Sequence, residues 1–285
     1  MFRVAAGVSK ASRNPQLTDR PQLVRTMLPV RKFFLDQGHF AEGAFRLVYK
    51  GKYTEGRRKG QPCVCKVFKT GAVMEDAYFA ADIKAVEKAL HLVDQWNSQK
   101  FINRTIKVNR AQIWSFYEGR HKGQKNLVEP FIQNWEKFNS NSGWVNSDGE
   151  SWSLVMQALS HYSYHVSSGQ FVLCDLQGGI YSDGAIITDP VIISRSAGTY
   201  GPTDLGPDGI LNFFGHHVCN KFCHSTWTKP RDTRRMYAPK ASTSMVVTTQ
   251  HSRPQLSRPA ICEDYSSRRL LVMRTTNFSE VKHAP

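Results

Sequence analysis

The chain has 285 residues, of which 40% are hydrophobic and 21% charged, and this composition is typical of one or two globular domains. Thirty-eight Lys and Arg against 23 Asp and Glu give a formal net charge of +15, which favours anionic partners such as nucleotide phosphates, nucleic acid or acidic protein surfaces. No apolar run approaches the roughly 20 residues that a membrane-spanning helix requires, so we expect no membrane span.

Six cysteines are too few for a disulfide scaffold in a chain of this length, and Cys219 and Cys223 lie close to histidines. The first residues lack the apolar core of a secretory signal. Both features predict a cytoplasmic, reducing compartment, in which cysteines bind metal rather than form disulfides.

Residues 1–38 combine three prolines with scattered arginines, which predicts an extended lead-in. Apolar and polar residues then alternate over residues 45–69 around a polar loop at 54–62, the pattern of an antiparallel hairpin. Residues 73–96 carry apolar side chains at three- and four-residue spacing, which predicts an amphipathic helix.

Residues 127–132 predict a buried strand that ends at Pro130, and residues 138–143 a turn-rich loop. Residues 152–164 have helical periodicity, whereas residues 171–176 are a short apolar strand that leads into a glycine-rich turn. Residues 224–285 are rich in Ser, Thr, Pro and Arg and hold eleven Lys and Arg against four Asp and Glu. This composition predicts a disordered basic tail.

A candidate zinc site combines His217, Cys219 and Cys223 with His161 far upstream. Thiolates and imidazoles are the ligands that zinc prefers, and two cysteines four residues apart would face one side of a helix. His216 is an alternative ligand to His217. The competing interpretation is a pair of buried free cysteines next to surface histidines.

A second candidate site follows the strand at residues 171–176. Asp175 and Gln177 stand at the strand end, and Asp189 follows after a short loop. Oxygen ligands of this kind can hold Mg²⁺ beside a phosphate while one carboxylate acts as a base. An ordinary turn residue is the alternative for each Asp.

Lys66 lies among apolar residues on a predicted central strand, where its charge must find an anion such as phosphate or snorkel to solvent from an edge. Ahead of it, the turn at residues 42–46 can present backbone amides and Arg46 to a phosphate. The loop at residues 200–206 is flanked by glycines that allow close approach of a ligand.

In this order the segments resemble the alpha-kinases, a family of atypical protein kinases. The resemblance runs from about residue 40 to residue 223. It rests on residues 42–46, the Lys66 strand, and the segments Val128-Glu-Pro-Phe131, Lys137-Phe-Asn-Ser-Asn-Ser-Gly143, Ser160-His161, Asp175-Leu-Gln-Gly178, Thr188-Asp-Pro190, Gly201-Pro-Thr-Asp-Leu-Gly206 and His217 to Cys223.

The resemblance implies a role for each matching residue. Lys66 would contact the ATP phosphates under a lid containing Gly43, Ala44 and Arg46, while Glu129 and Ile132 would lie at the adenine. Asp175 would be the catalytic acid/base, and Gln177 and Asp189 the Mg²⁺ ligands. Gly201 and Gly206 would bound a peptide-substrate loop, and the zinc ligands would be His161, His217, Cys219 and Cys223.

We therefore expect a two-lobed α+β kinase that uses ATP, Mg²⁺ and a structural Zn²⁺ to phosphorylate Ser or Thr in protein substrates. The kinase domain would span residues 39–229, with a mainly β N-lobe (40–127) that includes the long helix and a zinc-containing C-lobe (128–229). Glu75, Asp76, Asp82 and Glu87 of that helix are candidate partners of Lys66.

The tail, residues 230–285, would be a target of the kinase itself, a docking arm for acidic partners, or an inert linker. Two other functions compete with an active kinase: a zinc-stabilised nucleic-acid-binding module, suggested by the basic charge, and an inactive kinase-fold scaffold. We do not expect nucleic acid as a partner, because that function has no use for Asp175, Gln177 and Asp189.

Overall fold

The computed structural model describes residues 38–43, 46–54, 56–69, 71–116, 122–147 and 151–245. The predicted lead-in therefore lies outside the described residues except for Gly38, as does the tail from residue 246 onward.

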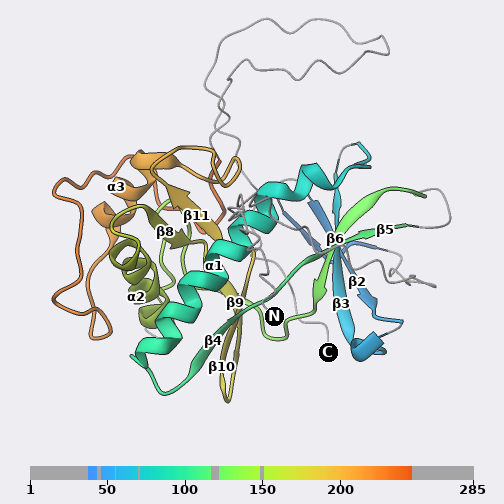
Figure 1. The fold of residues 1–285 in the computed structure, drawn as a ribbon, viewed down its shortest axis with the longest axis horizontal. Helices are drawn as coiled ribbons and strands as arrows, with labels where there is room; N and C mark the ends of the chain where they lie inside the picture. The colour runs from blue at the N-terminus through green and yellow to red at the C-terminus, as the bar shows by residue number, and fades with distance from the viewer. Residues whose placement is uncertain are drawn as a thin grey trace, which may run out of the picture.

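A five-stranded antiparallel sheet, in the order β1-β2-β3-β6-β5, forms one end of the molecule (Figure 1). Its strands are β1 (Ala41–Glu42), β2 (Arg46–Lys52), β3 (Pro62–Phe68), β6 (Lys125–Pro130) and β5 (Gln112–Ser115). β2 pairs with β3 along its whole length, around a short 3-10 turn η1 (Gly56–Arg58). The hairpin predicted over residues 45–69 and the strand predicted to end at Pro130 are both confirmed.

The long helix begins later than its apolar spacing predicts. α1 spans Ala80–Gln99 and follows a 3-10 turn, η2 (Asp76–Phe79). Val73 does not start the helix, because its carbonyl accepts a hydrogen bond from the Lys125 amide of β6 at 2.7 Å. Lys100 ends the helix in a left-handed conformation, with φ at 56°.

α1 lies in the range expected for the N-lobe, yet its apolar face packs on the C-terminal body. One core cluster contains the buried face of α1 together with residues of α2, β8, β10 and β11. The strand that follows, β4 (Thr105–Val108), pairs in parallel with β10. Residues 80–108 thus join the C-terminal body, although they lie within the range 40–127.

The C-terminal body contains a second sheet, in the order β4-β10-β9-β7, and a two-stranded pair, β8 with β11. The remaining elements are β7 (Glu136–Lys137), α2 (Ser151–Val166), β8 (Phe171–Cys174), β9 (Gln177–Tyr181), β10 (Gly184–Thr188), β11 (Val191–Ser194) and α3 (Gly206–His216). The helix predicted over residues 152–164 is confirmed as α2.

Two glycines expected in a turn after residue 176 lie instead inside β9. A side chain at Gly178 would place its Cβ 1.9 Å from the Ile186 carbonyl oxygen of β10. At Gly179 a Cβ would lie 2.6 Å from the Gln133 carbonyl oxygen. These glycines therefore allow neighbouring backbone to approach β9 closely.

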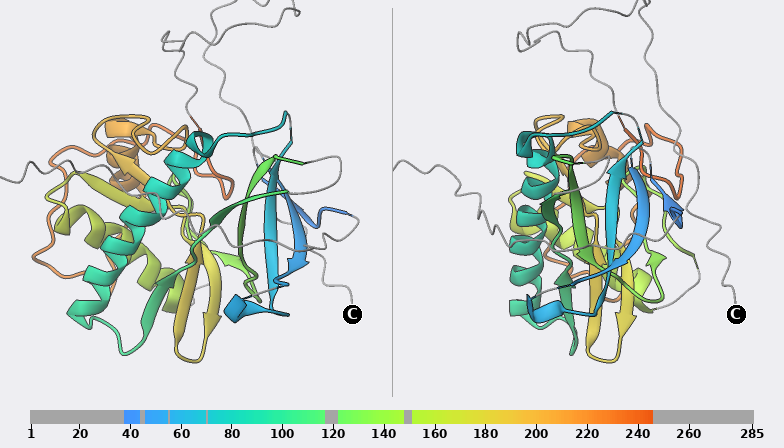
Figure 2. Two further views of the ribbon diagram at one scale, coloured as in Figure 1. Left: turned by 45° about the vertical axis from the view of Figure 1, so that its right-hand side comes forward. Right: turned by 90° about the vertical axis from the view of Figure 1, so that its right-hand side faces the viewer.

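Figures 1 and 2 show β4, β9 and β10 between the five-stranded sheet and helices α2 and α3, with α1 crossing the molecule diagonally. The start of β9 and the end of β10 thus lie near the boundary between the two bodies, where the Thr188 hydroxyl of β10 donates to Glu129 of β6. No helix in the described ranges is both long enough and apolar enough to cross a lipid bilayer.

The chain after α3 has no helix or strand up to residue 245, yet residues 230–245 pack against the C-terminal body. The Asn212 amide oxygen accepts hydrogen bonds from the Met236 and Tyr237 amides, both at 2.9 Å. Met245 is buried. The prediction of a disordered tail from residue 230 is therefore wrong for these residues, because composition does not register single hydrogen bonds to the folded body.

We expect Trp96→Ala to lower the free energy of unfolding by about 3–5 kcal/mol, the usual cost of deleting a buried aromatic side chain. The Trp96 ring contacts those of Phe101, Tyr162 and Trp227, with centroids 5.0, 5.5 and 6.1 Å away. The measurement is equilibrium unfolding in urea. Glu87→Ala on the exposed face of the same helix is the control and should change the free energy by less than about 0.5 kcal/mol. Equal effects of the two changes would contradict the packing.

Candidate functional site

A buried lysine joins the two bodies through two carboxylates. The Lys66 ammonium lies 2.6 Å from Glu129 Oε1 and 2.5 and 2.6 Å from the two carboxylate oxygens of Asp189. The other Glu129 oxygen accepts a hydrogen bond from the Thr188 hydroxyl at 2.8 Å. The four acidic residues considered on the long helix are thus not the partners of Lys66.

Strand register explains why these groups meet. Lys66 on β3 is opposite Leu127 of β6, so Glu129, two residues further along β6, points to the same face of the sheet. Asp189 directly follows β10 and has φ at 48°, in the left-handed region. Asp and Asn tolerate that region better than other side chains, which is consistent with an Asp at this position.

The electrostatics favour the charged forms of Lys66 and Asp189, whereas burial raises the pKa of Glu129. Burial alone would lower the pKa of Lys66, but Asp189 and Glu129 raise it above the ordinary lysine value. Desolvation would raise the pKa of Asp189, yet Lys66 and Arg46 lower it below its usual value. The Asp189 side chain is 49% exposed, whereas that of Lys66 is 8% exposed. Asp189 can therefore contact a cation from solvent while Lys66 stays buried.

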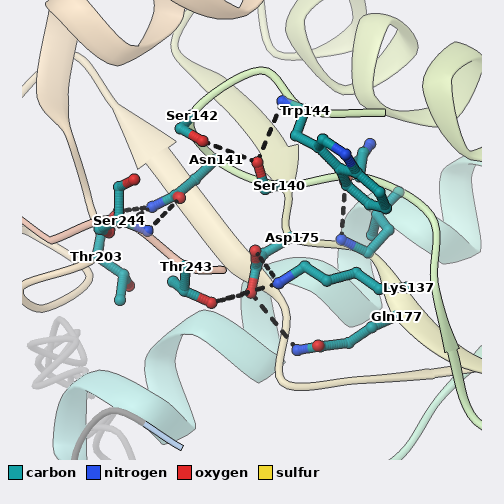
Figure 3. Close-up of polar contacts among 12 residues, drawn as sticks. Lys137, Ser140, Asn141, Ser142, Trp144, Asp175, Gln177, Thr203, Thr243 and Ser244 are labelled. Carbon is teal, nitrogen blue, oxygen red and sulfur yellow. Dashed lines mark hydrogen bonds and ion pairs between the residues drawn. The ribbon is translucent and has the colours of Figure 1, made fainter. Parts of the chain in front are cut away.

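Asp175 is the centre of a second polar cluster, drawn in Figure 3. Lys137 Nζ lies 2.8 Å from Asp175 Oδ1, and the Thr243 hydroxyl donates to Asp175 Oδ2 at 2.7 Å. The Gln177 amide nitrogen faces the same oxygen at 3.5 Å, which leaves the amide oxygen of Gln177 to coordinate a cation. Asp175 is buried, with φ at 58°. This left-handed conformation ends β8 at Cys174, although the strand was expected to run to residue 176.

The second sheet places these side chains at one end of its strands, where β9 starts and β10 ends. Lys137 of β7 is opposite Gln177 of β9, and Gln177 is opposite Thr188 of β10. Because β9 and β10 are antiparallel, the start of β9 and the end of β10 lie at the same edge. Asp175, two residues before Gln177, and Asp189, one residue after Thr188, therefore flank one short row of residues.

Arg46, expected in a phosphate lid, pairs with an acidic residue of α1 in the described structure. Its guanidinium makes a bidentate ion pair with Asp82 of α1, with both contacts at 2.8 Å, and lies over the Phe68 ring at 4.7 Å. The Gly43 amide donates to the Arg46 carbonyl at 2.8 Å. Ala44 lies outside the described residues. Arg46 thus ties β2 to α1 and contributes positive charge from that position.

The end of β6 is tied to the second sheet by Asn109. Its amide nitrogen donates to the Pro130 carbonyl at 2.9 Å, while its backbone amide donates to the Ile187 carbonyl. Ile132 is buried over β9, in the space that Gly179 leaves free. The Glu129 carboxylate is engaged by the Lys66 ammonium and the Thr188 hydroxyl.

The loop at residues 196–206 is built around Asp204, which sequence inspection did not single out. Asp204 is buried and accepts hydrogen bonds from the Ser194 amide and hydroxyl at 2.8 and 2.7 Å. Gly201 and Gly206 have φ at 90° and 68°, which only glycine adopts readily. The carbonyl of Thr203 in this loop accepts a hydrogen bond from the Asn141 amide nitrogen at 2.9 Å.

The four residues proposed as zinc ligands form one cluster, in which all ligand atoms of His161, His217, Cys219 and Cys223 lie within 4.8 Å of one another. His216 is outside it, with its ring nitrogen 2.9 Å from the Asn212 carbonyl oxygen, so His217 rather than His216 belongs to this cluster. The two cysteines do not share a helix face, because α3 ends at His216 and a turn follows.

The geometry of this cluster fits zinc. Cys219 Sγ lies 3.6 Å from His161 Nδ1 and 3.6 Å from His217 Nε2, and ligands of a tetrahedral zinc are about 3.5 Å apart. The other ring nitrogens contact the oxygens of Thr228 and Gln157, which orients the imidazoles. Burial lowers the pKa of His161 to about 4 and of His217 to about 3, so both rings are neutral and able to bind a cation.

Sequence inspection missed Lys137 and Thr243 as contacts of Asp175, and Glu129 as a contact of Lys66. Lys137 was part of a recognised segment, but no spacing links it to an acid 38 positions away. Thr243 lay in a stretch whose composition indicated disorder. Only Glu129 carried a usable signal, because it is an acid within a predicted apolar strand, as Lys66 is a cation within another.

Comparison with known proteins gives a consistent result. A model of the alpha-kinase family matches residues 41–223. Alpha-protein kinase 1 of Dictyostelium discoideum is 32% identical over 186 residues, which are 65% of this chain and 13% of that protein. A novel alpha kinase from Entamoeba histolytica has a similar fold, with a TM-score of 0.61 and 20% identity, covering 74% of this chain and 84% of that one.

The fold also matches the alpha-kinase domain of myosin-II heavy chain kinase A in complex with AMP-PNP, with a TM-score of 0.57 and 23% identity. That match covers 67% of this chain and 86% of the other. The family model spans well over half of the chain, in agreement with the motifs noted in the sequence. The chain belongs to the alpha-kinase family.

Proposed function

We propose that the chain is an ATP-dependent protein kinase that transfers the γ-phosphate of ATP to Ser or Thr with Mg²⁺. The observation that carries this proposal is the pair of carboxylates at one edge of β9 and β10. Asp175 accepts a hydroxyl hydrogen bond, and Asp189 is held by a buried lysine. One carboxylate is thus placed to accept a proton, and the other to bind a cation near phosphate.

Phosphoryl transfer requires little more than positioning, charge neutralisation and a proton acceptor. Lys66 provides a fixed positive charge for the phosphates. Asp189 and the Gln177 amide oxygen would hold Mg²⁺, which when bound neutralises phosphate charge. Asp175 accepts the proton of the substrate hydroxyl, while Lys137 orients its carboxylate by pairing with the other oxygen.

The nucleotide fits at the boundary between the two bodies. A related domain, that of myosin-II heavy chain kinase A, was solved with AMP-PNP, which supports nucleotide binding here. We place the adenine at the end of β6, beside the backbone of Glu129 and the side chain of Ile132. The turn at Gly43 and the guanidinium of Arg46 contribute to the phosphate side.

The two other functions have less support. A nucleic-acid-binding module has no use for the buried pairing of Lys66 with Glu129 and Asp189, or for that of Lys137 with Asp175. An inactive scaffold would have no use for a hydroxyl hydrogen bond on Asp175 or for a buried lysine that holds Asp189.

We further propose that His161, His217, Cys219 and Cys223 hold one structural zinc. The donor set and the spacing of its atoms support this, and a set of four protein ligands leaves no open position for catalysis. The zinc would join α2 to the segment that follows α3.

We expect Asp175→Asn to lower kcat about 10²–10⁴-fold, because the amide cannot accept the proton of the substrate hydroxyl. The assay follows transfer of labelled phosphate from ATP and Mg²⁺ to a generic basic protein, with phosphoserine and phosphothreonine identified after hydrolysis. Asp94→Asn on the exposed face of α1 is the control. Full activity of the Asp175 variant would remove this residue from catalysis, and labelled phosphotyrosine alone would refute the acceptor assignment.

We expect Asp189→Asn to lower kcat about 10²-fold and to raise the Mg²⁺ concentration needed for half-maximal activity, because a neutral amide binds the cation less well. The variant keeps the shape of the side chain and leaves Glu129 to pair with Lys66. Asp183→Asn, an exposed carboxylate at the β9–β10 turn, is the matched control. An unchanged Mg²⁺ dependence in the Asp189 variant would sink its role as a ligand.

We expect one zinc per chain by elemental analysis, and strong chelation should unfold the C-terminal body, since filling such a site contributes on the order of 10 kcal/mol in zinc peptides. Cys223→Ser should lose most of the metal. His224→Ala, which lies outside the cluster, should retain it. Purified protein without zinc, or equal zinc in both variants, would count against the site.

A further inference from the structure

The chain places one of its own hydroxyl groups on the proposed catalytic base. Thr243 Oγ1 donates to Asp175 Oδ2 at 2.7 Å, a distance within the range expected between a general base and the hydroxyl that it deprotonates. Lys137 occupies the other oxygen of the same carboxylate. The Thr243 hydroxyl therefore lies where the hydroxyl of an acceptor residue would have to lie to give its proton to Asp175 (Figure 3).

The neighbouring residues are held through their main chain, as a bound peptide is. The Asn141 side chain accepts from the Ser244 amide at 2.8 Å and donates to the Ser244 carbonyl at 2.8 Å. The Ser142 hydroxyl likewise accepts from the Lys240 amide at 3.0 Å and donates to its carbonyl at 3.2 Å. Main-chain hydrogen bonds of this type give affinity for an extended segment irrespective of its side chains.

This segment lies beside the loop at residues 201–206. The Asn141 amide nitrogen donates both to the Thr203 carbonyl of that loop and to the Ser244 carbonyl. Figure 3 shows Thr203, Asn141 and Ser244 grouped on one side of Asp175. The segment thus contacts the catalytic carboxylate and adjoins the glycine-flanked loop.

We propose that residues 240–245 occupy the acceptor-peptide site of their own chain and that Thr243 is a phosphorylation site modified in cis. This inference rests on the proposed kinase function. In the reaction, Thr243 Oγ1 attacks the γ-phosphorus of ATP, and the bond from that phosphorus to the oxygen bridging the β-phosphate breaks. ADP leaves with the bonding electron pair, and the hydroxyl proton passes to Asp175. The products are phosphothreonine 243 and ADP.

Intramolecular transfer has a kinetic signature. Because Thr243 is already in place, its phosphorylation should follow a first-order rate constant that does not depend on enzyme concentration. Phosphorylation between two chains would instead speed up as concentration rises. The two routes are distinguished by diluting the enzyme at constant ATP.

The experiment uses the full chain, treated first with a phosphatase that is then removed, and incubated with ATP and Mg²⁺ at several enzyme concentrations. Mass spectrometry quantifies phosphate at residue 243, and a generic basic protein serves as an external substrate in a parallel assay. We expect phosphate at Thr243 with a rate constant unchanged by dilution. Thr243→Ser should still accept phosphate at that position, and Thr243→Val should not.

Thr105→Val, the same substitution on the exposed strand β4, is the matched control and should leave phosphorylation of Thr243 intact. A chain that phosphorylates the external protein but not Thr243 would overturn this inference and leave the kinase function standing. A rate proportional to enzyme concentration would also overturn it. Absence of transfer to any acceptor would instead refute the kinase function, so the two failures differ.

Discussion

The pairing of the Lys66 ammonium with Glu129 and Asp189 is the interaction on which the arrangement of the site depends. A buried cation is tolerated only when it is paired, and here one partner comes from each body of the molecule. Glu129 is buried and fixed by β6, whereas Asp189 is half exposed at the end of β10. The asymmetry matters, because Glu129 keeps the lysine charged and in place while Asp189 remains able to bind a second cation.

The backbone at Asp175 and Asp189 carries a cost that the surrounding strands offset. Both residues have positive φ, which costs of order 1 kcal/mol or more for a residue with a side chain. Each turns the chain sharply at the end of a strand, so that β8 gives way to β9 and β10 to β11 within a few residues. The pairing of β9 with β10, and the close approach permitted by Gly178, hold both turns at the same edge.

The sequence allowed the local elements to be predicted, but not which body each joined. Alternation and helical spacing identified the β2–β3 hairpin, β6 and α2, because these patterns reflect burial of one face. The same spacing in α1 could not reveal that its apolar face meets α2 and β4 rather than the N-terminal sheet. The family resemblance was enough to group His161, His217, Cys219 and Cys223, whereas the contacts of Lys137 and Thr243 depend on single polar contacts between distant segments.

The segment after α3 connects the two chemical centres of the C-terminal body. It supplies Cys219 and Cys223 to the metal cluster and then packs Trp227 against the His161 ring, with centroids 5.4 Å apart. Sixteen residues further along the chain, Thr243 reaches Asp175. A metal held by this cluster would shorten the free length of chain before Thr243 and so lower the entropy cost of holding its hydroxyl on the carboxylate. The His/Cys cluster and Thr243 are therefore linked by one stretch of chain that has no helix or strand of its own.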